Sequence, residues 1–294
     1  MRISVVTATW NREGYLPEAL DSILAEGFED LEAVVVDDGS TDSTPGVAAR
    51  YGDRIRYLRQ ENAGPSAARN RGVEAACAPL VAFLDSDDAW LPGRLARQVP
   101  MLESEPDAIL LYAAVDYVDG DGRPVPDARL PRRTPSGEAL AALLRENFVR
   151  MPTVIVRRDA FLAAGGFRED LVHCEDWDLW MRLAGKGRFL YDPVPSARYR
   201  LHGSQLIRDR RLLAEARVRI LGDHVPRLEA AGSPHLPGAR RALAHRCLRL
   251  ARLDLREGRK EEATRLMKRA VDLVPSMRLE AFRLRLVEGL RLRG

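Results

Sequence analysis

Four short strand-like segments alternate with stretches of helical periodicity in the first 84 residues, and this alternation constrains the fold more than any other feature. The segments lie at residues 3–7, 31–36, 54–58 and 81–84. Strands that alternate with helices are typical of a parallel sheet covered by helices on both faces. The sequence therefore predicts an α/β domain with a mostly parallel sheet, and ligands of such sheets bind outside the carboxyl ends of the strands. Later segments at residues 151–156, 188–191 and 197–201 predict further strands of this sheet.

Polar residues follow each of the four predicted strands. They are Thr9, Asn11 and Arg12 after the first strand, Asp37 and Asp38 after the second, Asn62 and Gly64 after the third, and Asp85, Asp87 and Asp88 after the fourth. Because the carboxyl ends of parallel strands meet at one edge of the sheet, we expect one crevice to collect all four loops.

The three carboxylates that end the fourth strand are the most informative cluster. Carboxylates crowded at the end of a buried strand repel one another and lose hydration, so a cation or hydrogen-bond donors must compensate. Hard oxygen ligands suit Mg²⁺ or Mn²⁺, which keep coordination positions open for substrate phosphates. Capping of the following helix is the ordinary alternative for Asp85 and Asp87. The working hypothesis is a divalent-metal site for a diphosphate.

The Asp37-Asp38-Gly39 loop allows two interpretations. Asp-Gly is a common turn, and the Ser and Thr that follow are common helix caps. Alternatively, one of the two aspartates accepts hydrogen bonds from a nucleobase or a ribose, which suits an acceptor-only carboxylate.

Five further residues carry the same kind of ambiguity. Arg12 and Arg69 match phosphate oxygens but are ordinary surface residues if taken singly. Glu175 and Asp176 open a predicted helix, where the dipole favours acidic residues, and the alternative is a general base for an acceptor hydroxyl. His202, just after a strand, is a surface residue or a ligand. No G-x-G-x-x-G or Walker lysine follows the first strand, which argues against a dinucleotide enzyme or a P-loop ATPase.

Size and composition fit a globular protein. The 294 residues, 46% of them hydrophobic, suffice for one large domain or two ordinary ones. No signal-like apolar segment and no run of about 18 apolar residues occur, so we expect a cytoplasmic protein without a membrane span. Three widely spaced cysteines predict reduced and mostly buried thiols.

The charge is distributed unevenly along the chain. From Gln205 to the end there are 22 Lys and Arg against 11 Asp and Glu, a net charge of +11, whereas the preceding residues carry −8. We therefore expect two domains, 1–205 and a basic α-helical region at 206–294. Peripheral contact with the inner face of an anionic membrane is one role for this tail, and a solvated bundle is the favoured alternative. Nucleic acid is not expected as a partner, because the arginines lack interleaved aromatics.

Taken together, these residues resemble glycosyltransferase family 2, whose members have the GT-A fold, a Rossmann-like fold for nucleotide-diphospho-sugar transfer. The resemblance covers about residues 1–205, and its ordered combination of segments is specific. The matching segments are residues 5–12, 34–44, 62–70, 83–91, 175–176 and 199–202.

The resemblance implies inverting transfer from a nucleoside-diphosphate sugar, most often a UDP sugar. It assigns the base and ribose to Thr7, Asn11 and Asp38 or Asp37, further ribose contact to Asp85, the metal to Asp87, and the general base to Asp176. His202 matches a histidine that reaches the metal or diphosphate in some relatives. The predicted donor site also includes Thr9, Arg12, Asn62, Gly64 and Arg69, and the predicted metal site includes Asp88. The Q-x-x-R-W motif of processive synthases is absent, so one sugar per encounter is expected.

Two other classes of protein stay open from the residues alone. A metal-dependent nucleotidyltransferase or sugar-nucleotide pyrophosphorylase has a similar fold. Such an enzyme requires a glycine-rich basic loop after the first strand, and residues 9–14 do not provide one. A non-catalytic interaction protein that uses the helical tail is the third hypothesis. The donor sugar, the acceptor (a saccharide, a lipid-linked or another hydroxyl) and the oligomeric state, a homodimer included, stay open.

Overall fold

The computed structural model of the chain describes residues 1–125, 135–201 and 210–291, with side chains as far as Leu284. The chain divides into two compact units, which we call the sheet unit and the helical unit. The sheet unit comprises Met1–Ala139, Asn147–Asp170 and Glu175–Gln205, and the helical unit comprises Leu140–Glu146, Leu171–Cys174 and Leu206–Gly294. Two short segments from the front of the chain thus belong to the helical unit, which the charge pattern did not indicate.

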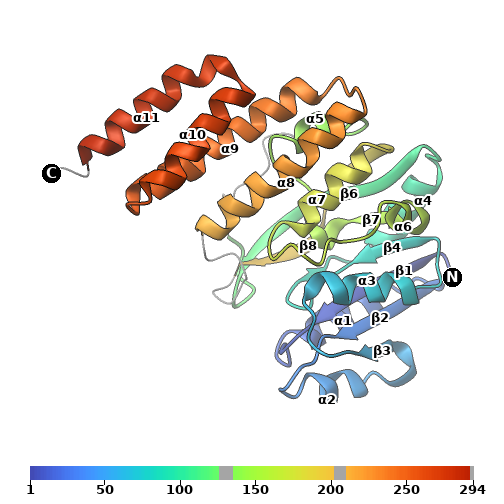
Figure 1. The fold of residues 1–294 in the computed structure, drawn as a ribbon. Coiled ribbons are helices and arrows are strands. Elements are labelled where there is room, and N and C mark those ends of the chain that lie inside the picture. Colours follow the sequence, from blue (N-terminus) through green and yellow to red (C-terminus); the bar gives the residue numbers. More distant parts are fainter. Residues whose placement is uncertain (126–134, 202–209, 292–294) are drawn as a thin grey trace. The chain divides into compact units, whose positions relative to one another are not determined.

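The described part of the sheet unit contains one eight-stranded sheet (Figure 1). Its strands are β1 (Ile3–Thr9), β2 (Leu31–Asp37), β3 (Arg56–Arg59), β4 (Leu80–Phe83), β5 (Ala89–Trp90), β6 (Ala108–Asp119), β7 (Ile155–Arg157) and β8 (Arg188–Leu201). Their order is β3-β2-β1-β4-β7-β6-β8-β5. The four predicted strands are confirmed as the parallel half, β3-β2-β1-β4. Strands β7 and β5 run antiparallel to their neighbours, so the sheet is mixed.

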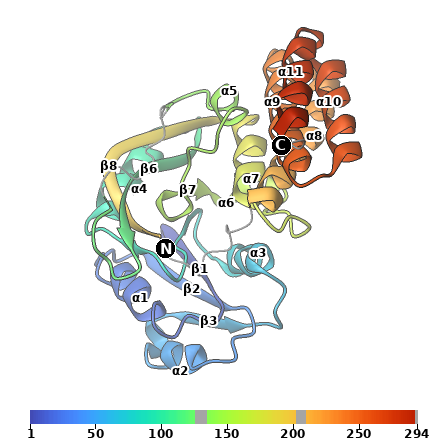
Figure 2. The same cartoon turned by 90° about the vertical axis from the view of Figure 1, so that its left-hand side faces the viewer.

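Helices cover both faces of the sheet. Figure 2 shows α1 and α3 on opposite sides of β1 and β2. The helices of the sheet unit are α1 (Leu16–Leu24), α2 (Thr44–Ala49), α3 (Pro65–Ala75), α4 (Arg94–Glu103), α6 (Arg158–Ala163) and α7 (Glu175–Ala184), with short 3-10 turns η1 (Gly52–Arg54) and η2 (Met151–Thr153). Side chains of α1, α2 and α4 share a buried cluster with alternate residues of β1 and β2, including Val5 and Val35. This alternation follows from the two-residue period of a strand.

Close packing of α3 on the sheet requires a glycine. A Cβ atom at Gly72 would lie 2.3 Å from Cγ1 of Val6 on β1. Helix α3 therefore approaches the strand more closely than a side chain at position 72 would permit. Since α3 carries Arg69, this approach helps to set the position of that guanidinium beside the carboxyl end of β4.

Two predicted elements differ from the structure. Residues 188–191 and 197–201, predicted as separate strands, belong to the single strand β8, whose pairing with β6 skips residues between Asp192 and Ala197. The predicted strand at 151–156 begins instead as η2. Its bend is held because Trp90 and Arg94 donate hydrogen bonds to the Pro152 carbonyl.

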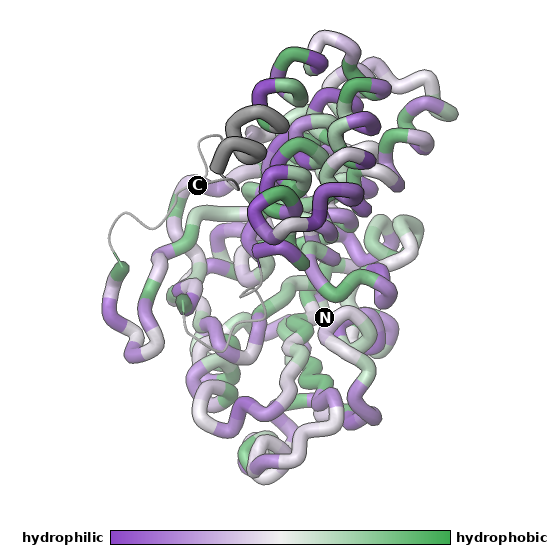
Figure 3. Tube along the Cα trace, turned by 60° about the vertical axis from the view of Figure 1, so that its left-hand side comes forward, coloured by the Kyte–Doolittle hydropathy of each residue, from purple (hydrophilic) through white to green (hydrophobic). Residues whose placement is uncertain are grey.

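The helical unit consists mainly of helices, along which hydrophilic and hydrophobic residues are interspersed (Figure 3). Its helices are α5 (Leu140–Leu143), α8 (Arg210–Ala230), α9 (Leu236–Arg256), α10 (Lys260–Leu273) and α11 (Arg278–Arg291), with the 3-10 turn η3 (Pro275–Met277). None of the described helices is both long and apolar enough to span a membrane. The expectation of mostly buried cysteines was wrong, because Cys77 is exposed and only Cys247 is buried among the three.

Candidate functional site

The first two parallel strands end at the same level of the sheet. Thr9 of β1 pairs with Asp37 of β2. Asn11, which has a positive φ of 52°, fastens the two following loops together. Its side-chain Oδ1 accepts a hydrogen bond from the Thr41 amide at 2.8 Å, and its own amide donates to Ser40 Oγ at 3.0 Å. The carboxamide oxygen of Asn11 is therefore bonded to the loop backbone, and the predicted nucleotide contact of this residue stays a prediction.

The two aspartates after β2 differ in their partners. Asp37 is fully buried, and its carboxylate accepts hydrogen bonds from the Ser40 amide at 2.8 Å and the Tyr57 hydroxyl at 2.5 Å. Burial and the bond to Asp37 raise the pKa of Tyr57. Asp38 accepts from the amides of Ala63 at 2.9 Å and Gly64 at 2.8 Å. Asp37 thus stabilises its own turn, whereas Asp38 holds the loop that leads into α3.

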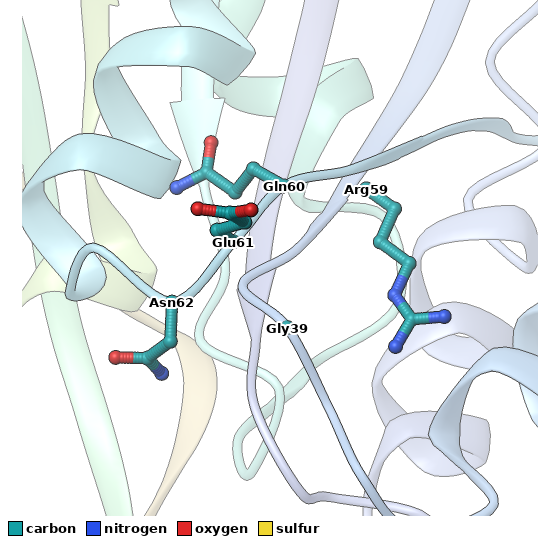
Figure 4. A pocket seen from close by; sticks show the side chains of 5 residues that line it. All are labelled: Gly39, Arg59, Gln60, Glu61 and Asn62. Atoms are coloured by element: carbon teal, nitrogen blue, oxygen red, sulfur yellow. The ribbon is translucent and has the colours of Figure 1, made fainter.

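An open pocket lies at these loops, and Figure 4 shows the residues that line it. They are Gly39, Arg59, Gln60, Glu61 and Asn62. Gly39 has φ of 77°, and a Cβ there would lie 2.9 Å from the Asn62 amide nitrogen. The Asn62 side chain donates to the Asp38 carbonyl at 3.0 Å. The pocket is therefore built from the loops that the sequence selected, around a glycine that the close approach requires.

Two predicted contacts on β1 keep hydroxyl groups without partners. Thr7 and Thr9 are buried, and neither Oγ1 atom has a hydrogen-bond partner among the residues that the structure describes. The same is true of Ser66 Oγ in the first turn of α3. Most buried polar atoms in proteins are hydrogen-bonded, so these three hydroxyls represent unused bonding capacity near the pocket loops.

The acidic cluster after β4 is held by arginines from three different segments. Asp85 pairs with Arg69 at 2.7 Å, and Asp87 lies 3.6 Å from Arg12 Nε. Asp88 is buried and accepts a hydrogen bond from the backbone amide of Arg200 at 2.8 Å. The structure thus compensates the crowded carboxylates with donors, as expected from their repulsion.

The electrostatics of the cluster separate its members. Burial raises the pKa of Asp88 well above its usual range, and the charges of Asp87 and Asp85 add to this effect. Burial also raises the pKa of Asp85, although Arg69 opposes it. The side chains of Asp85 and Asp87 are 27% and 20% exposed, but the ion pair of Asp87 to Arg12 is the longer, at 3.6 Å against 2.7 Å for Asp85 and Arg69. By its looser pairing, and not by its exposure, Asp87 is the member of the cluster that is better placed to take an additional cation.

Arg69 joins the acidic cluster to the predicted base region. Its Nη2 donates to Asp85 at 2.7 Å and its Nη1 donates to Glu175 at 2.9 Å. The guanidinium also lies over the ring of Phe167, 5.6 Å from the ring centre. Arg69, predicted to contact phosphate, is thus shared between two carboxylates that are 90 residues apart in the sequence. This contact brings the end of β4 and the start of α7 together.

Asp176 follows Glu175 in the first turn of α7. Its Oδ2 accepts a hydrogen bond from the Asn147 side chain at 2.8 Å, and its Oδ1 accepts from the Trp177 amide at 2.6 Å. Burial and the negative charge of Glu175 raise the pKa of Asp176 to about 6, although these hydrogen bonds oppose the rise. A carboxylate with such a pKa is ionised at neutral pH and is more basic than an ordinary aspartate, as a general base requires.

Three residues of this region were not predicted. Asn147 bonds Asp176, Arg150 lies beside Asn147, and Arg200 anchors Asp88. Neither Asn147 nor Arg150 stands at a fixed spacing from another motif. Arg200 lies two residues before His202, in the segment that carries the family resemblance, so that segment did contain a signal for it. His202 itself lies outside the described residues.

The described residues do not form a preformed metal cage. Within them, no group of three or more His, Cys, Asp or Glu side chains is arranged to hold a metal ion. A carboxylate oxygen of Asp85 is bonded to Arg69, and one of Asp88 is bonded to the Arg200 amide. Mg²⁺ commonly takes one or two protein carboxylates together with substrate phosphates. The residues therefore fit a cation held jointly by Asp87 and a diphosphate.

Comparison with known proteins places the sequence in a family. The profile of Glycosyl transferase family 2 matches residues 4–163, more than half of the chain. An uncharacterized glycosyltransferase of Rickettsia felis is 30% identical over 210 residues, which cover 69% of this chain and 35% of that protein. One of Rickettsia prowazekii is 28% identical over 208 residues, which cover 69% of this chain and 65% of that protein. The match thus spans about one third to two thirds of the length of these relatives.

Solved structures show the same fold at lower identity. Staphylococcus aureus TarS 1–349, in complex with UDP-GlcNAc, has a TM-score of 0.62 at 21% identity, covering 95% of this chain and 92% of that one. The mannosyltransferase PcManGT of Pyrobaculum calidifontis, in complex with GDP-Man and Mn²⁺, has a TM-score of 0.58 at 19% identity, covering 99% and 80%. These likenesses establish a GT-A type fold. By its sequence profile and its fold, the chain belongs to glycosyl transferase family 2.

Proposed function

We propose that this chain transfers one sugar from a nucleoside-diphosphate donor, a UDP sugar in the first instance, to an acceptor hydroxyl with inversion at the anomeric carbon. Family membership supports the reaction type, and the nucleotide sugars bound by TarS and PcManGT support the donor class. The observation that carries the proposal is the Asp176 carboxylate, whose pKa is raised to about 6 and whose neighbour Glu175 is joined to Asp85 through Arg69.

Asp176 acts as the general base. It takes the proton of the acceptor hydroxyl while the acceptor oxygen forms its bond to the anomeric carbon. The bond from that carbon to the diphosphate breaks on the opposite face, and its electron pair leaves with the nucleoside diphosphate. A single displacement inverts the anomeric centre and needs no covalent nucleophile. A positioned base contributes on the order of 10² to 10⁴ in rate.

The donor occupies the loops at the carboxyl ends of β1 to β4. The pocket of Figure 4 and the Asp38 loop receive the base and ribose, with Asp85 on the ribose side. Asn11 and Asp37 support this pocket through the loop backbone, since their side-chain oxygens accept hydrogen bonds from it. Thr7 and Thr9 supply hydroxyls that lack partners in the described structure.

A divalent cation, Mn²⁺ or Mg²⁺, fits at Asp87. When bound, such a cation neutralises charge on the departing diphosphate. Arg12, 3.6 Å from Asp87, adds a second positive charge from the protein. One carboxylate oxygen of Asp88 is already bonded to the backbone amide of Arg200. We therefore assign the cation to Asp87, with Asp88 as a neighbouring carboxylate of the same cluster.

Donor screening tests the proposed function directly. UDP, GDP and dTDP sugars are compared by thermal shift with and without Mn²⁺, and nucleoside-diphosphate release is then measured with the best donor. Asp176→Asn is expected to keep donor binding and to lose turnover. Asp121→Asn, which alters an aspartate with a 70% exposed side chain, is the matched control. Turnover that survives in Asp176→Asn at the wild-type rate would remove the base from the mechanism.

A further inference from the structure

Arg150 is a half-buried arginine that makes no ion pair with any residue that the structure describes. Its Nε donates to the Tyr117 hydroxyl at 2.9 Å, and its Nη1 donates to the Asn147 carbonyl at 3.1 Å. Both acceptors are neutral. Among the described residues, no carboxylate oxygen lies within the 4.0 Å of an ion pair with this guanidinium. Taking a guanidinium out of water without a carboxylate at ion-pair distance is unfavourable.

Two other buried arginines of the sheet unit show how unusual this arrangement is. Arg69 is paired with two carboxylates. Arg94 has no carboxylate partner, but its Nε, Nη1 and Nη2 donate to three oxygens, and its guanidinium stacks on Trp90 at 4.0 Å. Arg150 has no carboxylate at ion-pair distance, and its Nη2 donates no hydrogen bond to a described residue. This Nη2 atom is also not among the unbonded atoms that are fully shielded from solvent. One edge of its guanidinium is therefore open to a ligand.

The open guanidinium lies beside the proposed base. Asn147 joins the two groups, because its carbonyl accepts from Arg150 while its side chain donates to Asp176. Burial alone lowers the pKa of Arg150, but the neighbouring Tyr117, Tyr199 and Asp176 raise it above its ordinary value. The proposed position of the donor diphosphate already has a cationic side chain in Arg12. Arg150 is thus on the side of the site where the acceptor hydroxyl meets its base.

We propose that Arg150 recognises an anionic group, a carboxylate or a phosphate, carried by the acceptor, so that the acceptor class is acidic. This inference rests on the proposed function, because the role of Asp176 defines the acceptor side. A planar guanidinium binds carboxylate or phosphate oxygens in pairs, which lysine does not reproduce. Losing a hydrogen bond to a charged group corresponds to roughly 10- to 100-fold in affinity.

Binding of simple anions tests Arg150 without any enzymatic activity. Inorganic phosphate and acetate are titrated into the full chain while the Arg150 Nε–H resonance is followed by NMR, with Arg150→Lys used to assign it. We expect a saturable shift of this resonance that persists when UDP and Mg²⁺, a diamagnetic cation, are already bound. An unmoved resonance overturns the proposal. A response that UDP and Mg²⁺ abolish assigns the anion to the donor diphosphate and overturns the acceptor source.

Paired acceptors test the consequence for catalysis. Phenyl β-glucuronide and phenyl β-glucoside differ in a carboxylate at one carbon, and kcat/KM is compared for the two. Arg150→Gln is expected to reduce the preference for the acidic acceptor roughly 10- to 100-fold, and Arg150→Lys to reduce it less. Arg123→Gln, at a 74% exposed side chain, should leave the preference unchanged. Equal losses on both acceptors would overturn the proposal.

Absence of donor turnover in the wild type would instead refute the proposed function, and the NMR result would still decide on Arg150.

Discussion

Replacing Asn147 by leucine is expected to move the acid limb of the pH–rate profile to higher pH while leaving the base in place. The Asn147 side chain donates a hydrogen bond to Asp176 Oδ2 at 2.8 Å. A hydrogen bond to a carboxylate favours its ionised form, so its loss raises the pKa of Asp176. Because the base works only when ionised, activity then requires a higher pH.

The size of the effect follows from the environment of Asp176, whose pKa is about 6 with the hydrogen bond present. A hydrogen bond to a charged group contributes about 1.5–3 kcal/mol, and one pKa unit corresponds to about 1.4 kcal/mol. Taking the lower end, because water replaces part of the lost bond, the variant should have a pKa of about 7. The rate should then fall about fivefold at pH 6 and hardly at all at pH 8.5.

Nucleoside-diphosphate release between pH 5 and 9, at saturating donor, measures the pH–rate profile and the position of its acid limb. Glu175→Gln provides a test in the opposite direction, because the Glu175 charge raises the pKa of Asp176 and its removal should move the acid limb to lower pH. Asp121→Asn, which alters an exposed aspartate in a turn, should leave the profile unchanged. If Asn147→Leu and Glu175→Gln shift the limb in the same direction, or not at all, the assignment of this pKa to Asp176 is wrong.

Further predictions concern the acidic cluster and its arginine. Asp87→Asn should abolish the Mn²⁺-dependent thermal stabilisation by UDP, whereas Asp88→Asn should retain it; equal loss would contradict the division of roles. Asp88→Asn should also raise the melting temperature at pH 8 with a gain that shrinks toward pH 4, because the raised pKa of Asp88 means that stability is lost as pH rises through it. Arg69→Leu should lower the free energy of unfolding by about 3–5 kcal/mol, since it leaves Asp85 and Glu175 without their shared partner. Urea denaturation measures this loss, and a change below about 1 kcal/mol would show that the network is dispensable.

Strands β1, β2 and β4 could be predicted because they are largely buried and their sequences are short apolar runs, whereas β3 (Arg56–Arg59) is an exposed to half-buried edge strand with a weaker pattern. The continuity of β8 could not be predicted, because Pro193 and Pro195 interrupt the apolar pattern and lack the amide that a ladder needs. The structure accommodates them where the pairing with β6 skips residues between Asp192 and Ala197. Strand β5, only two residues long, is defined by its partner β8 and has no pattern of its own.

The contacts between the predicted loops could be anticipated from the sequence, whereas the partners of single side chains could not, and the roles of the site residues stay predictions. The loops after β1 and β2 are joined through Asn11, and Asp37 bonds the backbone of its own turn. The sequence identifies which side chain stands at each position but not its hydrogen-bond partner. The bonds of these side chains to backbone groups could therefore not be predicted. Asn147 and Arg150 could not be predicted because only the folded chain brings them beside Asp176.

The membership of Leu140–Glu146 and Leu171–Cys174 in the helical unit has a practical consequence for dissecting the protein. These two insertions immediately precede Asn147 and Glu175 along the chain. A fragment cut after Gln205 would retain both insertions but lose the helices α8 to α11 with which they form a compact body. Leu143 and Leu171 are buried in the intact chain. The segments that lead into Asn147 and into Glu175 would then lack the rest of their compact unit, so such a fragment is a poor substitute for the intact chain in kinetic work.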